Sequence, residues 1–297
     1  MIKVGTCSWT EKTLISGSEF YPKDTKSAEG RLRFYAQRFS TVEVDSTYYA
    51  IPNIRNAALW AERTPDDFIF HIKAYGALTG HGINPKTLPK DIAGALPGKD
   101  RDTTSAFVKE SELLRAISGR FTEALRPLER AGKLGLIVFQ YPPWFHCTPS
   151  NLAAILQAKE RMGGYEIGVE FRHGSWLSLR AAPSVYSFLR ENNITYIPAD
   201  EPQFGTFATI PFVPEVTSDT AYFRFHGRNR ETWLKKGIET SLRYDYLYAD
   251  KELRGFVPAV RAAQSRAKKV YAMFNNCNGS SAVRNALMLK DILGKDG

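Results

Sequence analysis

Charged side chains alternate with apolar ones in four short runs of this sequence, and their types are those that bind anions and move protons. The runs are residues 42–45, 68–73, 167–172 and 222–226. Because successive side chains of a strand point to opposite faces, each run predicts a strand with one apolar and one charged face. The charged faces present eight ionisable side chains: Glu43, Asp45, His71, Lys73, Glu170, Arg172, Arg224 and His226.

Cations beside carboxylates are typical of a site that holds an anion and transfers a proton. Arg and Lys can clamp a phosphate or carboxylate while a Glu or His moves the proton. We therefore expect a hydrolase or lyase with a small anionic substrate and an anion clamp of Lys73, Arg172 and Arg224. The expected acid–base residues are Glu43, Glu170, His226 and Asp200.

Two alternatives use the same charged residues. Carboxylates and cations could simply pair in a buried ion network. A divalent metal held by the carboxylates with His71 and His226 would instead make a metal-dependent phosphodiesterase resembling barrel DNA-repair endonucleases. The sequence has no His-x-His or His-Glu-x-x-His spacing, and three neighbouring cations disfavour a divalent ion. We therefore predict no metal and no cofactor.

Aromatic residues follow several of the predicted strands. Of the eight strands predicted below, the first, fourth, fifth and seventh are followed by Trp9, Trp144, Trp176 and Trp233, respectively. Aromatic faces beside Arg and Lys can stack bases or sugars, so a nucleotide or nucleic acid is an alternative partner. A non-catalytic nucleic-acid-binding module is then an alternative function, and loop packing gives the same pattern. We expect Trp9, Tyr48 and Trp176 to contact the substrate.

The ends of the last two predicted strands indicate a phosphate site. Gly227 has no side chain after His226, and loops after the seventh and eighth strands commonly bind phosphate in barrels. Asn275 could donate its amide to phosphate oxygens, whereas the alternative is that it caps the next helix. We therefore count Gly227 and Asn275 among the substrate-binding residues.

Eight runs rich in β-branched or aromatic residues must position these side chains. They are residues 3–9, 41–49, 68–75, 134–142, 165–173, 195–200, 220–227 and 269–276. Helical apolar spacing between them covers residues 31–39, 54–63, 107–130, 151–161, 185–192 and 247–266, and residues 282–293 follow the last strand. This alternation predicts an α/β fold, a (β/α)8 TIM-like barrel in a single domain over residues 1–297.

Two units depart from the regular pattern. The sixth unit is irregular, because residues 201–219 carry Pro202, Pro211 and Pro214 and read as a loop. A long loop, residues 76–106, follows the third strand and is rich in Gly and Pro. Since the loop also keeps apolar residues, we expect a mobile lid over the barrel mouth.

Five motifs together resemble the YecE-like family, domain of unknown function seventy-two. They lie at residues 5–9, 42–49, 169–173, 224–228 and 274–276. The resemblance implies a TIM-like barrel without an established activity. It carries over as characteristic positions Glu43, Lys73, Glu170, Arg172, Asp200, Arg224, His226, Gly227 and Asn275. Cys7 stands where we expect a small residue to be commoner in the family.

The composition of the 297 residues is that of a globular protein. Hydrophobic residues make up 43%, enough for a large core, and no run approaches the roughly 20 apolar residues that span a bilayer. We therefore expect a cytoplasmic protein without a membrane partner. The net charge of +9 favours anionic partners, and three cysteines without Cys-x-x-Cys spacing argue against a disulfide framework.

Overall fold

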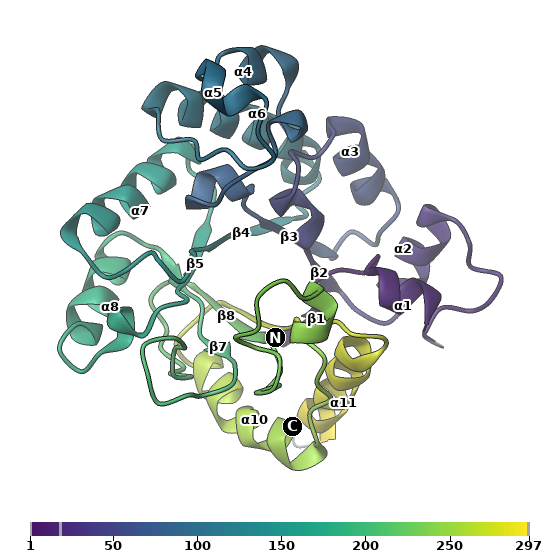
Figure 1. Ribbon diagram of the computed structural model, residues 1–297. Coiled ribbons are helices and arrows are strands. Elements are labelled where there is room, and N and C mark those ends of the chain that lie inside the picture. Colours follow the sequence, from purple (N-terminus) through teal and green to yellow (C-terminus); the bar gives the residue numbers. More distant parts are fainter. Residues whose placement is uncertain (1, 18–19, 296–297) are drawn as a thin grey trace.

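The computed structural model describes residues 2–17 and 20–295, so the predicted domain over 1–297 extends beyond them at both ends. Two parallel sheets surround a common centre (Figure 1). The first, in the order β1-β9-β8-β7, consists of β1 (Ile2–Thr6), β9 (Lys269–Phe274), β8 (Thr220–Phe225) and β7 (Ala199–Asp200). The second, in chain order, consists of β2 (Thr41–Val44), β3 (Ile69–Lys73), β4 (Leu134–Gln140), β5 (Ile167–Glu170) and β6 (Thr195–Tyr196). A mixed α/β fold with parallel strands is therefore confirmed.

The longer helices lie outside the strands (Figure 1). They are α2 (Ala28–Ala36), α3 (Ile54–Glu62), α6 (Ser111–Arg130), α7 (Pro149–Arg161), α8 (Ala182–Glu191), α10 (Asp250–Gln264) and α11 (Ser281–Lys295). Side chains that accept backbone N–H groups begin several of them, as Ser27 does for α2 and Thr148 for α7. Within the described residues, four short α-helices were not predicted: α1 (Lys12–Ser16), α4 (Lys90–Gly94), α5 (Gly98–Arg101) and α9 (Thr240–Arg243).

The two sheets approach each other at two places. β6 and β7 follow one another along the chain and are separated only by Ile197 and Pro198. Pro198 has no N–H to donate, which interrupts the ladder, although its carbonyl still accepts from Arg224 N at 3.0 Å. At the other seam, Cys7 just beyond β1 forms an isolated parallel bridge with Glu43 of β2.

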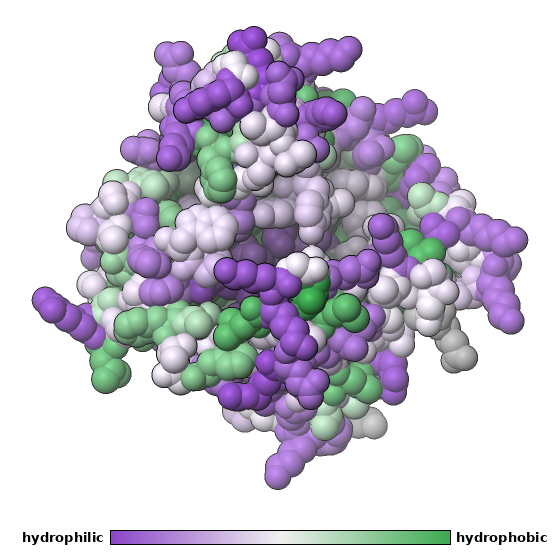
Figure 2. All heavy atoms as spheres, viewed as in Figure 1, coloured by the Kyte–Doolittle hydropathy of each residue, from purple (hydrophilic) through white to green (hydrophobic). Residues whose placement is uncertain are grey.

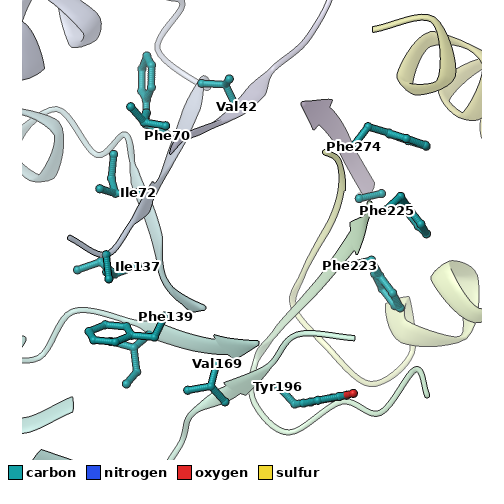
Figure 3. Packing of buried hydrophobic residues seen from close by; sticks show 14 of the residues in the cluster. Val42, Phe70, Ile72, Ile137, Phe139, Val169, Tyr196, Phe223, Phe225 and Phe274 are labelled. Carbon is teal, nitrogen blue, oxygen red and sulfur yellow. The ribbon is translucent and has the colours of Figure 1, made fainter. Parts of the chain in front are cut away.

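The two faces of the strands have different surroundings. Apolar side chains such as Val42, Phe70, Val169 and Phe223 point outward from the strands, away from the central space (Figure 3). This layer between strands and helices is the main hydrophobic core. A smaller buried cluster fills part of the inside and consists of Cys7, Leu136, Val138, Ile197, Tyr222, Tyr271 and Met273. The strand alternation read from the sequence is therefore correct.

The irregular units behave differently from each other. Residues 201–219 contain no helix, as the three prolines predict. The segment 76–106, in contrast, is not a lid over the strands: α4 contacts the outside of α6, and Ile83 pairs with Ala106 across the segment's ends (Figure 1). Its apolar side chains are buried in the main core, which is the physical reason for the difference: Leu78, Ile83, Leu88, Ile92 and Leu96.

Among the described residues, no helix has both the length and the apolar character needed to cross a bilayer.

Candidate functional site

Arg224 of β8 is at the centre of a buried ion network inside the strands. Its side chain is 0% exposed, and Nη2 donates to Glu43 Oε1 at 2.8 Å. Nη1 donates to Glu170 Oε2 at 2.5 Å and to Gln140 Oε1 at 3.1 Å. Arg224 is therefore the fully buried member of the predicted anion clamp, and carboxylates already bind both of its terminal nitrogens.

Arg172 lies beside this network but closer to solvent, with a side chain that is 10% exposed. Nε forms an ion pair with Glu170 Oε1 at 2.5 Å, and Nη1 donates to Glu201 Oε2 at 2.7 Å. Nη2 lies 3.2 Å from His226 Nε2 and makes two long contacts with oxygens, 3.4 Å to Gln140 Oε1 and 3.4 Å to Tyr244 OH. This third nitrogen therefore retains donor capacity for a ligand.

Glu201 was missed in the sequence, where Asp200 was chosen instead. Ile197 points to the inside. Because side chains alternate along a strand, Ala199 and Glu201 point to the inside as well. Burial raises the pKa of Glu201 to about 7, although the Arg172 cation opposes the change. The signal in the sequence was this alternation, continued one residue past the predicted strand end.

Glu170 is the carboxylate shared by both arginines. Burial alone would raise its pKa, but the cations of Arg172 and Arg224 hold the pKa well below its usual range. His226 lies next to it, with Nε2 at 3.1 Å from Glu170 Oε1. Glu170 therefore stays ionised and acts as the anionic anchor of the network.

His226 is held neutral. Asn275 Nδ2 lies 2.9 Å from His226 Nδ1. An amide nitrogen only donates, so Nδ1 accepts and the ring proton is on Nε2, facing Glu170. Burial, and then the Arg172 cation, lower the pKa of His226 to about 3. His226 and Asn275 thus position the carboxylate in this structure.

Glu43 and Asp45 form a carboxyl pair at the end of β2. Burial raises the pKa of Glu43 to about 7, Arg224 opposes this, and the charge of Asp45 and a hydrogen bond to it raise it further. Tyr222 OH donates to Glu43 Oε2 at 2.8 Å. Asp45 is 23% exposed, and its Oδ1 lies 3.6 Å from Lys73 Nζ. The pair links a buried carboxyl that holds a proton near neutral pH to a carboxylate that reaches solvent.

His71 lies inside as the alternation predicts, but one step nearer the amino ends of the strands. Its Nδ1 accepts from Leu136 N at 2.9 Å, where a register shift between β3 and β4 turns that N–H inward. The ring packs against Tyr222 and Tyr271, and burial lowers the pKa of His71 to about 3. His71 is therefore a neutral packing residue.

The aromatic residues divide between the core and the open end of the strands. Trp9 packs against Trp60, and Trp176 stacks on Phe171, so both predicted substrate contacts lie in the outer core. Tyr48 lies beside Lys73, with Nζ 5.1 Å from its ring centre. Sequence position alone could not separate these cases, because a residue after a strand can turn outward or inward.

Asp200 and Gly227 lie together on the outer side of β7 and β8. Arg228 Nη2 donates to Asp200 Oδ1 at 2.7 Å, and Tyr248 OH donates to Asp200 Oδ2 at 2.6 Å. Gly227 has φ +88°, and its N–H donates to Tyr248 OH at 2.8 Å. A Cβ at Gly227 would lie 2.6 Å from Tyr246 Cβ, so glycine is required for this close approach.

A hollow lined by hydrophilic residues opens at the centre of one face of the molecule (Figure 2). The partly exposed members of the network, Asp45, Lys73 and Arg172, are those that reach solvent. Within residues 2–17 and 20–295, no group of three His, Cys, Asp or Glu side chains is arranged to hold a metal ion. The three cysteines are free.

The protein belongs to the α/β class, with parallel strands that surround a charged interior, and comparison with known proteins gives its family. The chain belongs to the DUF72 family, whose model, "Protein of unknown function DUF72", matches residues 3–297. The UPF0759 protein YunF of Bacillus subtilis (strain 168) is 31% identical over 297 residues, covering 99% of this chain and 95% of that protein.

Two solved DUF72 structures are similar over nearly their whole length. The protein of Thermotoga maritima MSB8 has a TM-score of 0.77 and 32% identity, covering 99% of both chains. The protein of Enterococcus faecalis V583 has a TM-score of 0.78 and 28% identity, covering 99% of this chain and 96% of its own. The family resemblance predicted from the five motifs is therefore confirmed.

Proposed function

We propose that the protein is an enzyme, a hydrolase or lyase, that moves a proton to or from a small phosphate- or carboxylate-bearing substrate in the hollow. The observation that carries the proposal is the Glu43–Asp45 pair. A buried carboxyl with a pKa of about 7 exchanges protons readily at neutral pH, and Asp45 extends it to the solvent-exposed side. Asp45 is the group that touches the substrate, and Glu43 holds the proton behind it.

Arg172 and Lys73 supply the contacts to the anionic group. The oxygen partners of Arg172 Nη2 lie 3.4 Å away, and the 3.6 Å separation of Lys73 Nζ from Asp45 Oδ1 exceeds the 2.7–2.9 Å of a strong charge-assisted hydrogen bond. An anion placed between the two cations gains shorter contacts than the protein now makes. Arg224 contributes from behind, by fixing Glu43 and Glu170.

The proposal includes a single closed (β/α)8 barrel. The succession of β6 and β7 with only two residues between them supports closure at one seam. The Cys7–Glu43 bridge supports it at the other. In such barrels the carboxyl ends of the strands carry the catalytic groups, and Asp45, Lys73, Arg172 and His226 all follow or end their strands.

Calorimetric titration with inorganic phosphate, in two buffers of different ionisation enthalpy, tests the proton-holding pair. An anion bound in the hollow raises the affinity of Glu43 for protons, so binding near pH 7 should take up a fraction of a proton. Glu43→Gln should reduce that uptake. Asp219→Asn is the matched control, because this exposed carboxylate precedes β8 and pairs with Lys268. Equal uptake in wild type and Glu43→Gln would contradict the role of Glu43.

Turnover is tested on a panel of phosphate monoesters and hydroxycarboxylates, by phosphate release and by formation of unsaturated acids. We expect Asp45→Asn and Glu43→Gln to lower kcat by roughly 100-fold, the usual size of acid–base catalysis, with a smaller change in KM. Asp219→Asn should retain the wild-type rate. Absence of turnover across the panel, together with absence of proton uptake, would overturn the proposed function.

A further inference from the structure

Three aromatic rings line one side of the open end of the strands. Tyr48 follows β2, His81 lies in the segment after β3, and Trp144 lies in the loop after β4. The ring centres of Tyr48 and His81 are 5.2 Å apart, and those of His81 and Trp144 are 5.6 Å apart, both in edge-to-face geometry. We call Tyr48, His81 and Trp144 the first wall.

Two further rings, Trp233 and Tyr244, come from the loop after β8 and form the second wall. Their ring centres are 5.6 Å apart. The Arg172 guanidinium lies 5.6 Å from the centre of the Trp233 ring, and Arg172 Nη2 lies 3.4 Å from Tyr244 OH. The second wall therefore adjoins the proposed anion contact.

The two cations lie in the space that the walls share. Lys73 Nζ is 5.1 Å from the ring centre of Tyr48. Burial, and then the charges of Lys73 and Arg172, lower the pKa of His81 to about 4, so His81 stays neutral beside both cations. Neutral rings and fixed cations thus face one another across the site.

Contacts within the chain bury the Trp233 side chain but leave the Trp144 side chain exposed. Trp233 is 7% exposed and lies against His226 and Tyr244. Trp144 is 58% exposed and contacts His81 in edge-to-face geometry. A large indole left open to water beside His81 is available to stack on the flat face of a ligand.

We propose that the substrate carries a flat ring as well as an anionic group, as a nucleoside monophosphate does. The ring stacks on Trp144 of the first wall, while the phosphate contacts Lys73 Nζ and Arg172 Nη2. This assignment rests on the proposed function for its anionic contact and goes beyond it by naming the class of substrate. Stacking is sequence-tolerant among bases, so purine and pyrimidine nucleotides should both bind.

Titration calorimetry with inorganic phosphate, ribose 5-phosphate, adenosine and AMP separates the two contacts. AMP should bind about tenfold or more tightly than ribose 5-phosphate, the range expected for one stacked base. Trp144→Ala should abolish that advantage and leave the affinity for inorganic phosphate unchanged. Lys73→Met should weaken both AMP and phosphate. Phe207→Ala is the matched control, because Phe207 is an exposed aromatic residue whose ring packs at a tilt against His173 instead.

The outcomes distinguish this inference from the proposed function. AMP binding no tighter than ribose 5-phosphate, with Lys73-dependent phosphate binding intact, would overturn the stacked ring alone. Unchanged AMP affinity in Trp144→Ala would do the same. Adenosine binding as tightly as AMP would overturn the anionic contact, and the absence of any phosphate or AMP binding would overturn both proposals.

Discussion

Arg224 and Arg172 share one carboxylate, Glu170, yet the chain surrounds them differently. Arg224 is fully enclosed, and both terminal nitrogens bind carboxylates or Gln140. Arg172 reaches solvent, and the oxygen partners of its Nη2 lie 3.4 Å away. The two arginines therefore have different roles: Arg224 neutralises the buried carboxylates, and Arg172 is placed to contact a ligand. We call these two parts of the site the enclosed part and the open part.

The largest effect is expected from breaking the enclosed part with Arg224→Met. Glu43 and Glu170 would lose their common cation while still buried, which costs about 3–5 kcal/mol of unfolding free energy. Urea denaturation followed by circular dichroism measures the loss.

Arg172→Met provides the comparison. Glu170 would keep Arg224, and the Arg172 side chain is 10% exposed where that of Arg224 is 0% exposed, so water can enter the vacated position and the loss should be smaller. Arg33→Met, which removes an exposed pair with Glu29 on α2, should leave stability unchanged within error. Equal losses for Arg224→Met and Arg172→Met would remove the distinction between the two parts.

Glu201→Gln tests the pH dependence of the open part. The folded pKa of about 7 exceeds the ordinary 4.5, so folded Glu201 binds more protons than unfolded Glu201 in this window. The stability that protonated Glu201 contributes is fully present below pH 4.5 and is lost as the pH rises through 7. This loss of unfolding free energy is about 3 kcal/mol at most. Wild type should lose stability relative to Glu201→Gln between about pH 5 and about pH 8. A constant difference across that range would contradict the raised pKa.

Lys73→Met should affect binding and not folding. Its partner Asp45 is partly exposed, so little stability depends on the pair. Loss of one charge-assisted contact, about 1.5–3 kcal/mol, should weaken inorganic phosphate binding tenfold or more. Calorimetric titration at low salt measures the affinity, with a thermal melt as the control. A lowered melting temperature with unchanged affinity would assign Lys73 to the ion network instead.

The smallest effect is expected for Asp200→Asn. Asp200 contacts Arg228 and Tyr248 outside the network, so phosphate affinity and turnover should stay at wild-type values. Loss of the charge should lower stability by about 1 kcal/mol, because Asn still offers an oxygen to one donor. A lost proton uptake or rate in this variant would return Asp200 to the acid–base residues.

The alternation of side chains along strands is why much of the site could be predicted from the sequence. Glu43, Lys73, Glu170, Arg172, Arg224 and His226 lie inside because a regular strand leaves no other choice. Glu201 was missed because it lies one residue beyond the strand, which ends at Asp200 both in the prediction and in β7. Local periodicity also could not show that Arg224 would be enclosed, because that depends on side chains from β2 and β5.

Loops were harder to interpret. Trp9 and Trp176 follow strands as Tyr48 does, but their chains turn outward and bury the indoles in the core. Apolar residues in segment 76–106 showed that it packs against something without showing what. The location of α6 decides that, and no pattern within the segment records it.

The packed segment 76–106 has a consequence for how a ligand arrives. His81 is held by Thr79 Oγ1 at 2.8 Å from its Nδ1, and the segment behind it is fixed by the pairing of Ile83 with Ala106. The first wall is therefore already in place before binding. Association should follow a single kinetic phase whose rate rises linearly with ligand concentration, because no closing step has to follow the encounter.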